Sequence, residues 1–99
     1  MPEKAQENTE LLSAVFTALS NPVRLRILQL VSETRRPLHI KAVARALQMD
    51  YAAVYRHVDV LKKAGLVQIF EVGRSRVLSL LHADLIKKIF ALAQQIECK

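Results

Sequence analysis

The sequence has few cysteines and glycines, the residues that form disulfides and phosphate-binding loops. It contains one cysteine, Cys98, so no disulfide can form within the chain, and its two glycines are too few for a glycine-rich phosphate loop. No apolar run approaches the roughly 20 residues of a membrane-spanning helix. The polar start MPEKAQENTE does not resemble a signal peptide. These absences predict a soluble intracellular protein with a cytoplasmic location.

Groups for catalysis and metal binding are equally sparse. A nucleophile, a base and an orienting group do not occur together at any recognisable spacing. The three histidines, His39, His57 and His82, are widely separated, and none has a cysteine or a second histidine at ligand spacing. We therefore expect no enzymatic activity, no cofactor and no metal site. His57 is expected to be packed within the fold or to contact phosphate.

Acidic residues are scarce in the central part of the chain. The formal net charge is +6, and thirteen of the fifteen lysines and arginines lie between Arg24 and Lys88, beside only five acidic residues. The sequence pI is about 9.9. Such a positive field favours an acidic partner, and nucleic acid is the first candidate.

The stretch from Leu38 to Leu66 has the pattern of two short helices joined by a tight turn. Gln48 and Met49 form the predicted turn. Asp50 is suited to cap the second helix through its side-chain oxygen, and Gly65 can end that helix in a left-handed conformation. The sequence thus predicts a helix-turn-helix, whose inward-facing residues are Val43, Ala44 and Leu47, then Val54, Val58 and Leu61.

The N-terminal part predicts a tail followed by two helices. Residues 1–8 are polar and offer nothing to bury, so they are expected to form a flexible tail. A helix is predicted from Thr9. The second helix begins at Pro22, where no N–H is needed, is capped by Asn21 and ends near Glu33.

After Gly65 the apolar pattern changes from helical spacing to that of strands. Residues 66–72 and 76–81 predict a β-hairpin with a short basic tip, and Leu38 can add a third strand edge. Residues 83–98 return to helical spacing. The expected fold is one mainly α domain over residues 9–99, with a small β-hairpin and a dimerisation helix at each end.

Two motifs resemble the winged helix-turn-helix regulators of the ArsR type. Residues 18–28, ALSNPVRLRIL, are similar to that family's opening motif. Residues 54–67, VYRHVDVLKKAGLV, are similar to its recognition helix. The resemblance implies five helices plus a two- to three-stranded wing. It also implies a homodimer whose fourth helices enter successive major grooves, while the wings touch the flanking minor groove or backbone.

The sequence departs from the metal-sensing members of that family. Those members carry cysteines in the first helix of the helix-turn-helix, or Asp and His ligand pairs on the last helix. Here the two segments read HIKAVARAL and LHADLIKKIFALAQQIE, without a thiol or a histidine pair. Metal sensing is therefore not implied, and a metal site is not expected.

The candidate DNA-binding residues lie on the helix-turn-helix and the hairpin. If Val54, Val58 and Leu61 point inward, the 3.6-residue period turns the opposite side of that helix outward. An ordinary solvated helix face is the alternative there, and an ordinary charged hairpin tip is the alternative for the wing. The candidates are Ala52, Ala53, Tyr55, Arg56, Arg45, Lys41, Arg74 and Arg76.

The first and last helices have more apolar residues than one small core can cover. We therefore expect these helices to form a homodimer interface of Leu11, Leu12, Val15, Ile89, Leu92, Ala93 and Ile96. The function predicted by the whole sequence is a homodimeric regulator of transcription, a repressor, that binds specific double-stranded DNA. The alternative is a winged-helix module that binds protein or RNA.

Overall fold

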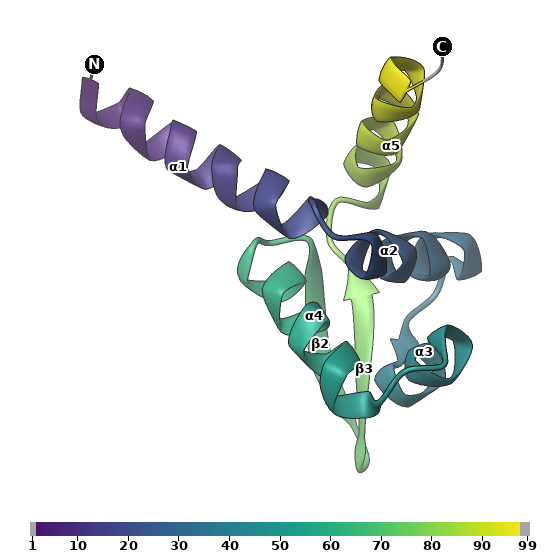
Figure 1. Cartoon of the computed structure of the whole chain (residues 1–99). Coiled ribbons are helices and arrows are strands. Elements are labelled where there is room, and N and C mark those ends of the chain that lie inside the picture. The colour runs from purple at the N-terminus through teal and green to yellow at the C-terminus, as the bar shows by residue number, and fades with distance from the viewer. Residues whose placement is uncertain (1, 98–99) are drawn as a thin grey trace.

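A computed structural model describes residues 2–97 of the chain, and the side chains of residues 8–97. Its helices and its small sheet follow the predicted order (Figure 1). The mainly α fold with a β-hairpin is therefore confirmed. The elements are α1 (Pro2–Leu19), α2 (Pro22–Thr34), β1 (Leu38–His39), α3 (Ile40–Leu47), α4 (Tyr51–Lys63), β2 (Val67–Val72), β3 (Ser75–Leu80) and α5 (Ala83–Glu97).

The first helix begins earlier than the sequence pattern indicated. The backbone is helical from Pro2, so the predicted helix start at Thr9 is wrong. The flexibility of the tail over residues 1–8 stays a prediction, and Met1 lies outside the described residues. Proline fits the first helical position, and the following Glu, Lys, Ala and Gln have high helix propensity. The break after α1 is as predicted. The Asn21 side chain accepts hydrogen bonds from the N–H groups of Val23 and Arg24, at 2.9 and 3.2 Å.

The turn between α3 and α4 lies where the sequence places it. Gln48 ends α3 in the left-handed region with φ 55°, and the N–H of Met49 donates to the carbonyl of Ala44. Asp50 occupies the N-cap position of α4, but its side chain accepts no hydrogen bond from the first turn. The predicted side-chain cap is therefore wrong. Asp50 is exposed, so water can satisfy both its carboxylate and the first N–H groups of α4.

The end of α4 depends on Gly65. Its φ is +82°, a conformation that side chains with a Cβ rarely adopt. The N–H of Leu66 then donates to the carbonyl of Leu61 at 3.0 Å, which satisfies one of the last helical carbonyls. The chain turns there directly into β2, as the sequence predicted.

The sheet has the strand order β1-β3-β2, and both pairings are antiparallel. Val72 pairs with Ser75 across a two-residue turn of Gly73 and Arg74. Gly73 has φ +62°, as the first turn position of a tight hairpin requires. Leu38 pairs with Leu78, which confirms the short third strand.

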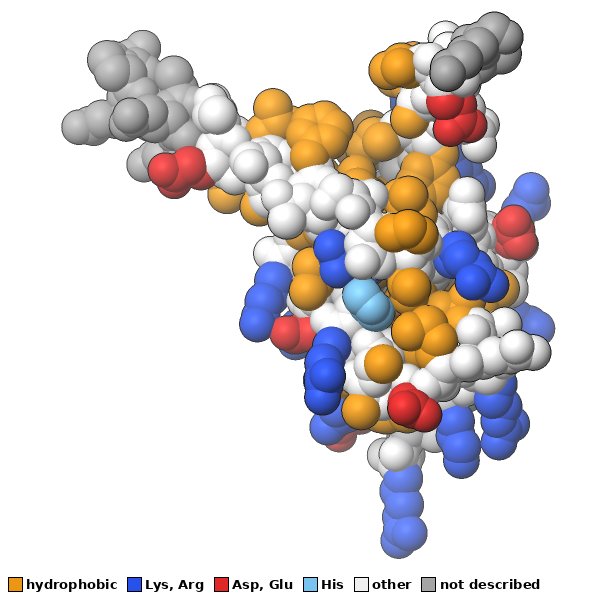
Figure 2. Space-filling view, in the orientation of Figure 1, with side chains coloured by type: hydrophobic (Ala, Val, Ile, Leu, Met, Phe, Trp, Pro, Cys, Tyr) orange, Lys and Arg blue, Asp and Glu red, His pale blue; other side chains and the backbone are white. Residues whose placement is uncertain are grey.

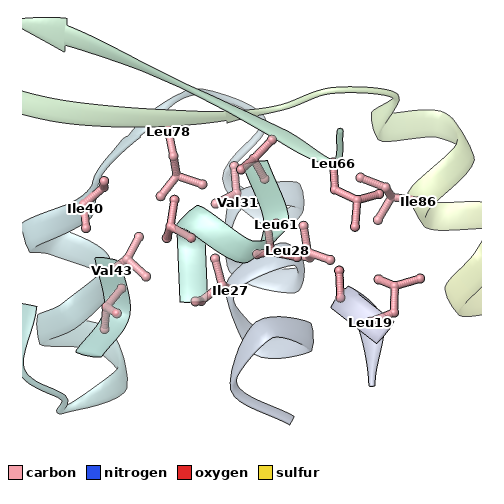
Figure 3. Packing of buried hydrophobic residues seen from close by; sticks show 14 of the residues in the cluster. Leu19, Ile27, Leu28, Val31, Ile40, Val43, Leu61, Leu66, Leu78 and Ile86 are labelled. Atoms are coloured by element: carbon pink, nitrogen blue, oxygen red, sulfur yellow. The ribbon is translucent and has the colours of Figure 1, made fainter. Parts of the chain in front are cut away.

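The core collects residues from the middle of the chain (Figure 3). Ile27, Leu28, Ile40, Leu61 and Leu78 are fully buried and join α2, α3, α4 and β3. Among the described residues, the outer helices place buried side chains in the core near their inner ends, namely Ala18 and Leu19 of α1 and Ile86 of α5. Both helices therefore project from the body of the domain, as Figure 1 shows.

No single helix among the described residues is long and apolar enough to cross a membrane. The segments Asn8–Leu19 and Pro22–Thr34 reach that length and hydropathy only as a pair, bent by 85°. The second of them places Ile27, Leu28 and Val31 in the core.

Candidate nucleic-acid interface

Helix α4 presents one side to the core and the other to solvent. Val54, Val58 and Leu61 are fully buried, which confirms the predicted inward face. Ala52 and Arg56 are exposed on the other side, as predicted. Ala53 and Tyr55 are instead half-buried, and Tyr55 packs against the core cluster. The outward face is therefore narrower than expected, because the sheet covers one edge of the helix.

An aromatic row that the sequence interpretation missed joins α4 to the wing. Tyr51, at the first position of α4, is 42% exposed and stacks on Tyr55 with ring centroids 6.2 Å apart and planes at 19°. The guanidinium carbon of Arg76 lies 4.8 Å from the centroid of the Tyr55 ring. The spacing of four residues between the tyrosines was a usable signal, since such pairs meet on one side of a helix. Arg76 of the hairpin therefore contacts α4 through the Tyr55 ring.

The remaining basic candidates have no acidic partner among the side chains that the structure describes. Lys41 and Arg45 on α3, Arg56 on α4 and Arg74 at the wing tip are exposed. Among the described side chains, the one ion pair joins Lys63 to Asp59 on α4, at 3.0 Å. Figure 2 shows lysine and arginine side chains around the end of the molecule that carries the wing tip. This surface can attract an anion without first breaking an ion pair.

Arg24 links the end of α1 to α4. Its Nε donates to the carbonyl of Ala18 at 2.7 Å, and one terminal nitrogen donates to the carbonyl of Thr17 at 3.2 Å. The other terminal nitrogen lies 3.2 Å from Nδ1 of His57. Arginine has no hydrogen-bond acceptor, so Nδ1 accepts the bond and carries no proton.

His57 is consequently a packed side chain within one chain, as expected. Burial lowers its pKa from the ordinary value of 6.5, and the positive charge of Arg24 lowers that pKa further. The sequence interpretation missed the role of Arg24, because 33 residues separate it from His57 and no local pattern connects them.

The predicted dimer residues lie on the two projecting helices. Leu12 is 57% exposed on α1, and Leu92 and Ile96 are 60% and 86% exposed on α5. Leu11 and Ala93 are also exposed, whereas Val15 and Ile89 are half-buried against the core. Two further exposed apolar residues, Phe16 and Leu85, were not predicted.

A groove of about 300 Å³ lies between α1, α2 and α5. Phe16, Leu25 and Phe90 line it, together with Ala93. Figure 2 shows apolar side chains gathered where the two outer helices leave the body. Over the part of one chain that the structure describes, no other element covers this apolar surface.

Potential metal ligands do not gather in the described part of the chain. No group of three or more His, Cys, Asp or Glu side chains in residues 8–97 could hold one metal ion. Cys98 lies outside the described residues. The absence of a metal site stays a prediction.

The profile of the helix-turn-helix domain family matches residues 19–68, which span α2, α3 and α4 and reach into β2. The chain belongs to the helix-turn-helix domain family. Comparison with curated protein sequences finds no match. Solved structures match this helix-turn-helix protein over nearly its whole length, whereas the family profile matches about half of it.

Several of these structures have a sequence identity of 25% or more, and two of them illustrate the match. The homodimeric winged helix-turn-helix DNA-binding domain of Mb0332 from Mycobacterium bovis, a possible ArsR-family regulator, is 26% identical. It covers 95% of this chain and 84% of its own, with a TM-score of 0.81. NolR from Sinorhizobium fredii is 25% identical, covers 97% and 92%, and has a TM-score of 0.79.

HlyU from Vibrio cholerae N16961 shares the fold at 21% identity and a TM-score of 0.74, covering 93% of this chain and 97% of its own. The resemblance to ArsR-type winged helix-turn-helix regulators is therefore confirmed. The α3–α4 pair is the helix-turn-helix of that fold, and the β2–β3 hairpin is its wing. Of these neighbours, the Mb0332 domain is described as DNA-binding and as a possible ArsR-family transcriptional regulator.

Proposed function

We propose that the protein regulates transcription by binding specific double-stranded DNA as a homodimer. One observation carries the proposal: Arg56 on the exposed side of α4 and Arg74 on the wing form no ion pair among the described side chains, and the Arg76–Tyr55 contact joins the two elements. The major groove is about 12 Å wide and admits an α-helix. In this proposal α4 enters that groove and the wing lies on the flanking backbone.

The side chains divide into two roles. Arg56 is exposed on the side of α4 opposite Val54 and Val58, where it would meet base edges, and arginine pairs well with guanine. Ala52, beside it, allows close approach and could contact a thymine methyl group. Lys41, Arg45 and Arg74 would contact phosphates, which position the protein without specifying sequence.

The homodimer follows from the apolar surfaces of α1 and α5. Leu12, Leu92 and Ile96 are more than half exposed in a single chain, and a second copy would bury them. The similar Mb0332 domain is described as homodimeric. Two-fold symmetry predicts an imperfect palindrome, with half-sites about one helical turn, roughly 34–36 Å, apart.

Repression through occupation of a promoter is the regulatory outcome that we propose. A cytoplasmic location accompanies the DNA partner as a prediction. A reporter gene placed behind the bound sequence tests the first point, since its expression should fall when the protein is supplied.

Selection from a random pool of duplexes tests the DNA-binding proposal. We expect enrichment of a palindromic sequence, and the Arg56→Ala variant should enrich it poorly. Lys88→Ala, which removes a positive charge from α5 outside the proposed interface, is the matched control and should enrich the same sequence. Failure to enrich any duplex, together with retention of RNA or a protein partner, would favour an interaction module.

A further inference from the structure

A second hollow lies on another part of the molecule, where α2, β3 and α5 meet. Its volume is about 280 Å³, close to the lower end of the range for small-molecule sites. β3 runs toward α2, and the chain continues from its end into α5 (Figure 1). The hollow therefore touches both the strand that leads from the wing and the start of a proposed dimerisation helix.

Three cationic side chains line this hollow. Arg35 and Arg36 follow the end of α2, and Lys87 belongs to the first half of α5. None of the three forms an ion pair in residues 8–97, and no carboxylate lines the hollow. Like charges around one concave site repel each other unless an anion lies between them.

The other lining groups suit the body of a small anion. Ser32 and Ser79 are half-buried and carry hydroxyl groups that can donate to an oxyanion. Val31 and Leu80 provide apolar wall for a carbon skeleton. A concave site with apolar walls and a few polar groups is typical of small-ligand binding, whereas a duplex backbone follows a broad, open surface.

The backbone at Arg35 adds an independent observation. Arg35 lies in the left-handed region with φ 58°, at the C-cap of α2. Glycine or asparagine adopts that conformation at lower cost than a residue with a long side chain. An arginine therefore lines the hollow at a backbone position that glycine or asparagine would occupy at lower conformational cost.

We propose that this hollow binds a small anion with two or more negative charges, either a phosphate ester or a polycarboxylate. Arg35, Arg36 and Lys87 would supply charge-assisted hydrogen bonds to its oxygens. A bound ligand would tie the end of α2 to the start of α5 and so restrict how α5 leaves the body. A regulatory role for the ligand rests on the proposed DNA-binding function, whereas binding of the anion does not.

Backbone amide NMR of the full chain tests the site without DNA. Inorganic phosphate and citrate are the two probes, and sodium chloride at equal ionic strength gives the reference. We expect saturable shifts at the amides of Ser32, Ser79 and Ala83, with a dissociation constant of about 1 mM or tighter. The probe that binds more tightly identifies the chemical class.

Two matched pairs of variants locate the binding. Lys87→Gln should weaken it about tenfold, whereas Lys88→Gln, the same change one residue outside the hollow, should leave it unchanged. Arg35→Asn keeps a residue that tolerates the left-handed conformation, so the fold should persist while binding weakens similarly.

Two outcomes would overturn the proposal. Shifts that do not saturate, or that weaken equally in both lysine variants, indicate general screening of charge. A Lys87→Gln variant that loses duplex affinity as strongly as Arg56→Ala, with no anion binding in the parent protein, would assign these cations to the DNA surface. Either result is distinct from failure of DNA binding itself, which this titration does not measure.

Discussion

The guanidinium of Arg76 on the wing lies 4.8 Å from the ring centroid of Tyr55 on α4, the proposed recognition helix. This contact crosses between two elements that both belong to the proposed DNA surface. Tyr55 is itself fixed, since it packs on the core and stacks on Tyr51. Within the proposed function, this contact would hold the wing against α4 before DNA binds, with Arg76 as a positioning residue.

The Arg76–Tyr55 contact should be measurable as a coupling energy. In a double-mutant cycle of Arg76→Ala and Tyr55→Leu, the coupling in the free energy of unfolding should be about 0.5 to 1 kcal/mol. Leucine keeps apolar packing while removing the ring. The same cycle with Arg74→Ala serves as control and should give no coupling. Urea denaturation supplies all the values, and equal coupling for both arginines would contradict the assignment.

Arg56 and Arg74 should differ in their effect on sequence preference. Arg56→Ala should reduce discrimination between the selected and a scrambled duplex by about 1 to 3 kcal/mol, because it removes a base contact. Arg74→Ala should weaken both duplexes alike, because a phosphate contact carries no sequence information. Fluorescence anisotropy with both duplexes checks this. An Arg56→Ala variant with unchanged preference would mean that α4 lies in a different orientation.

Leu92 on α5 should be needed for dimerisation. Leu92→Asp places a charge in the proposed interface, so sedimentation at micromolar protein concentration should shift from dimer to monomer, and duplex affinity should fall. Gln95→Asp is the matched control, because the helical period puts residue 95 on the polar side of α5. Circular dichroism should give equal helix content for both. If the parent protein itself sediments as a monomer, the proposed homodimer is wrong.

The stability of the protein should depend on pH through His57. Burial and Arg24 lower its pKa in the folded state, so the unfolded chain binds the proton at higher pH than the folded protein does. The resulting stability is complete above the unfolded pKa of about 6.5 and is lost as the pH falls through the lowered folded pKa.

The urea midpoint should therefore decrease between about pH 7.5 and about pH 5. His57→Asn removes the titrating ring, so the decrease in this variant should be smaller than in the parent. His82→Asn, at an exposed position, is the control and should behave as the parent does. Parallel curves for the parent and His57→Asn would exclude His57 as the source.

Much of the fold could be predicted because local patterns determine it. The apolar spacing of Val54, Val58 and Leu61 set the inward side of α4, and Gly65 marked its end. Patterns fail where tertiary packing decides. Tyr55 is at the predicted position in the helix, yet it is half-buried because Arg76 and the sheet cover it.

Other differences have equally specific causes. The Arg24–His57 contact joins residues far apart in sequence, so no local signal announces it. The predicted start of α1 was too late because the apolar periodicity begins near Leu11. The polar residues before it have high helix propensity, and the helix begins at Pro2. The roles of the eight candidate DNA-binding residues stay predictions, since exposure and charge do not identify a contacted base.

The dependence of duplex affinity on salt tests the central claim most directly. A homodimer that makes about 6 to 10 phosphate contacts through α3, α4 and the wing should lose roughly 10³ to 10⁵ in affinity between about 50 and about 200 mM salt. Fluorescence anisotropy of the selected palindrome over that range measures the slope. A steep linear fall of the logarithm of the binding constant is the predicted result, and binding unchanged over that range would contradict the account.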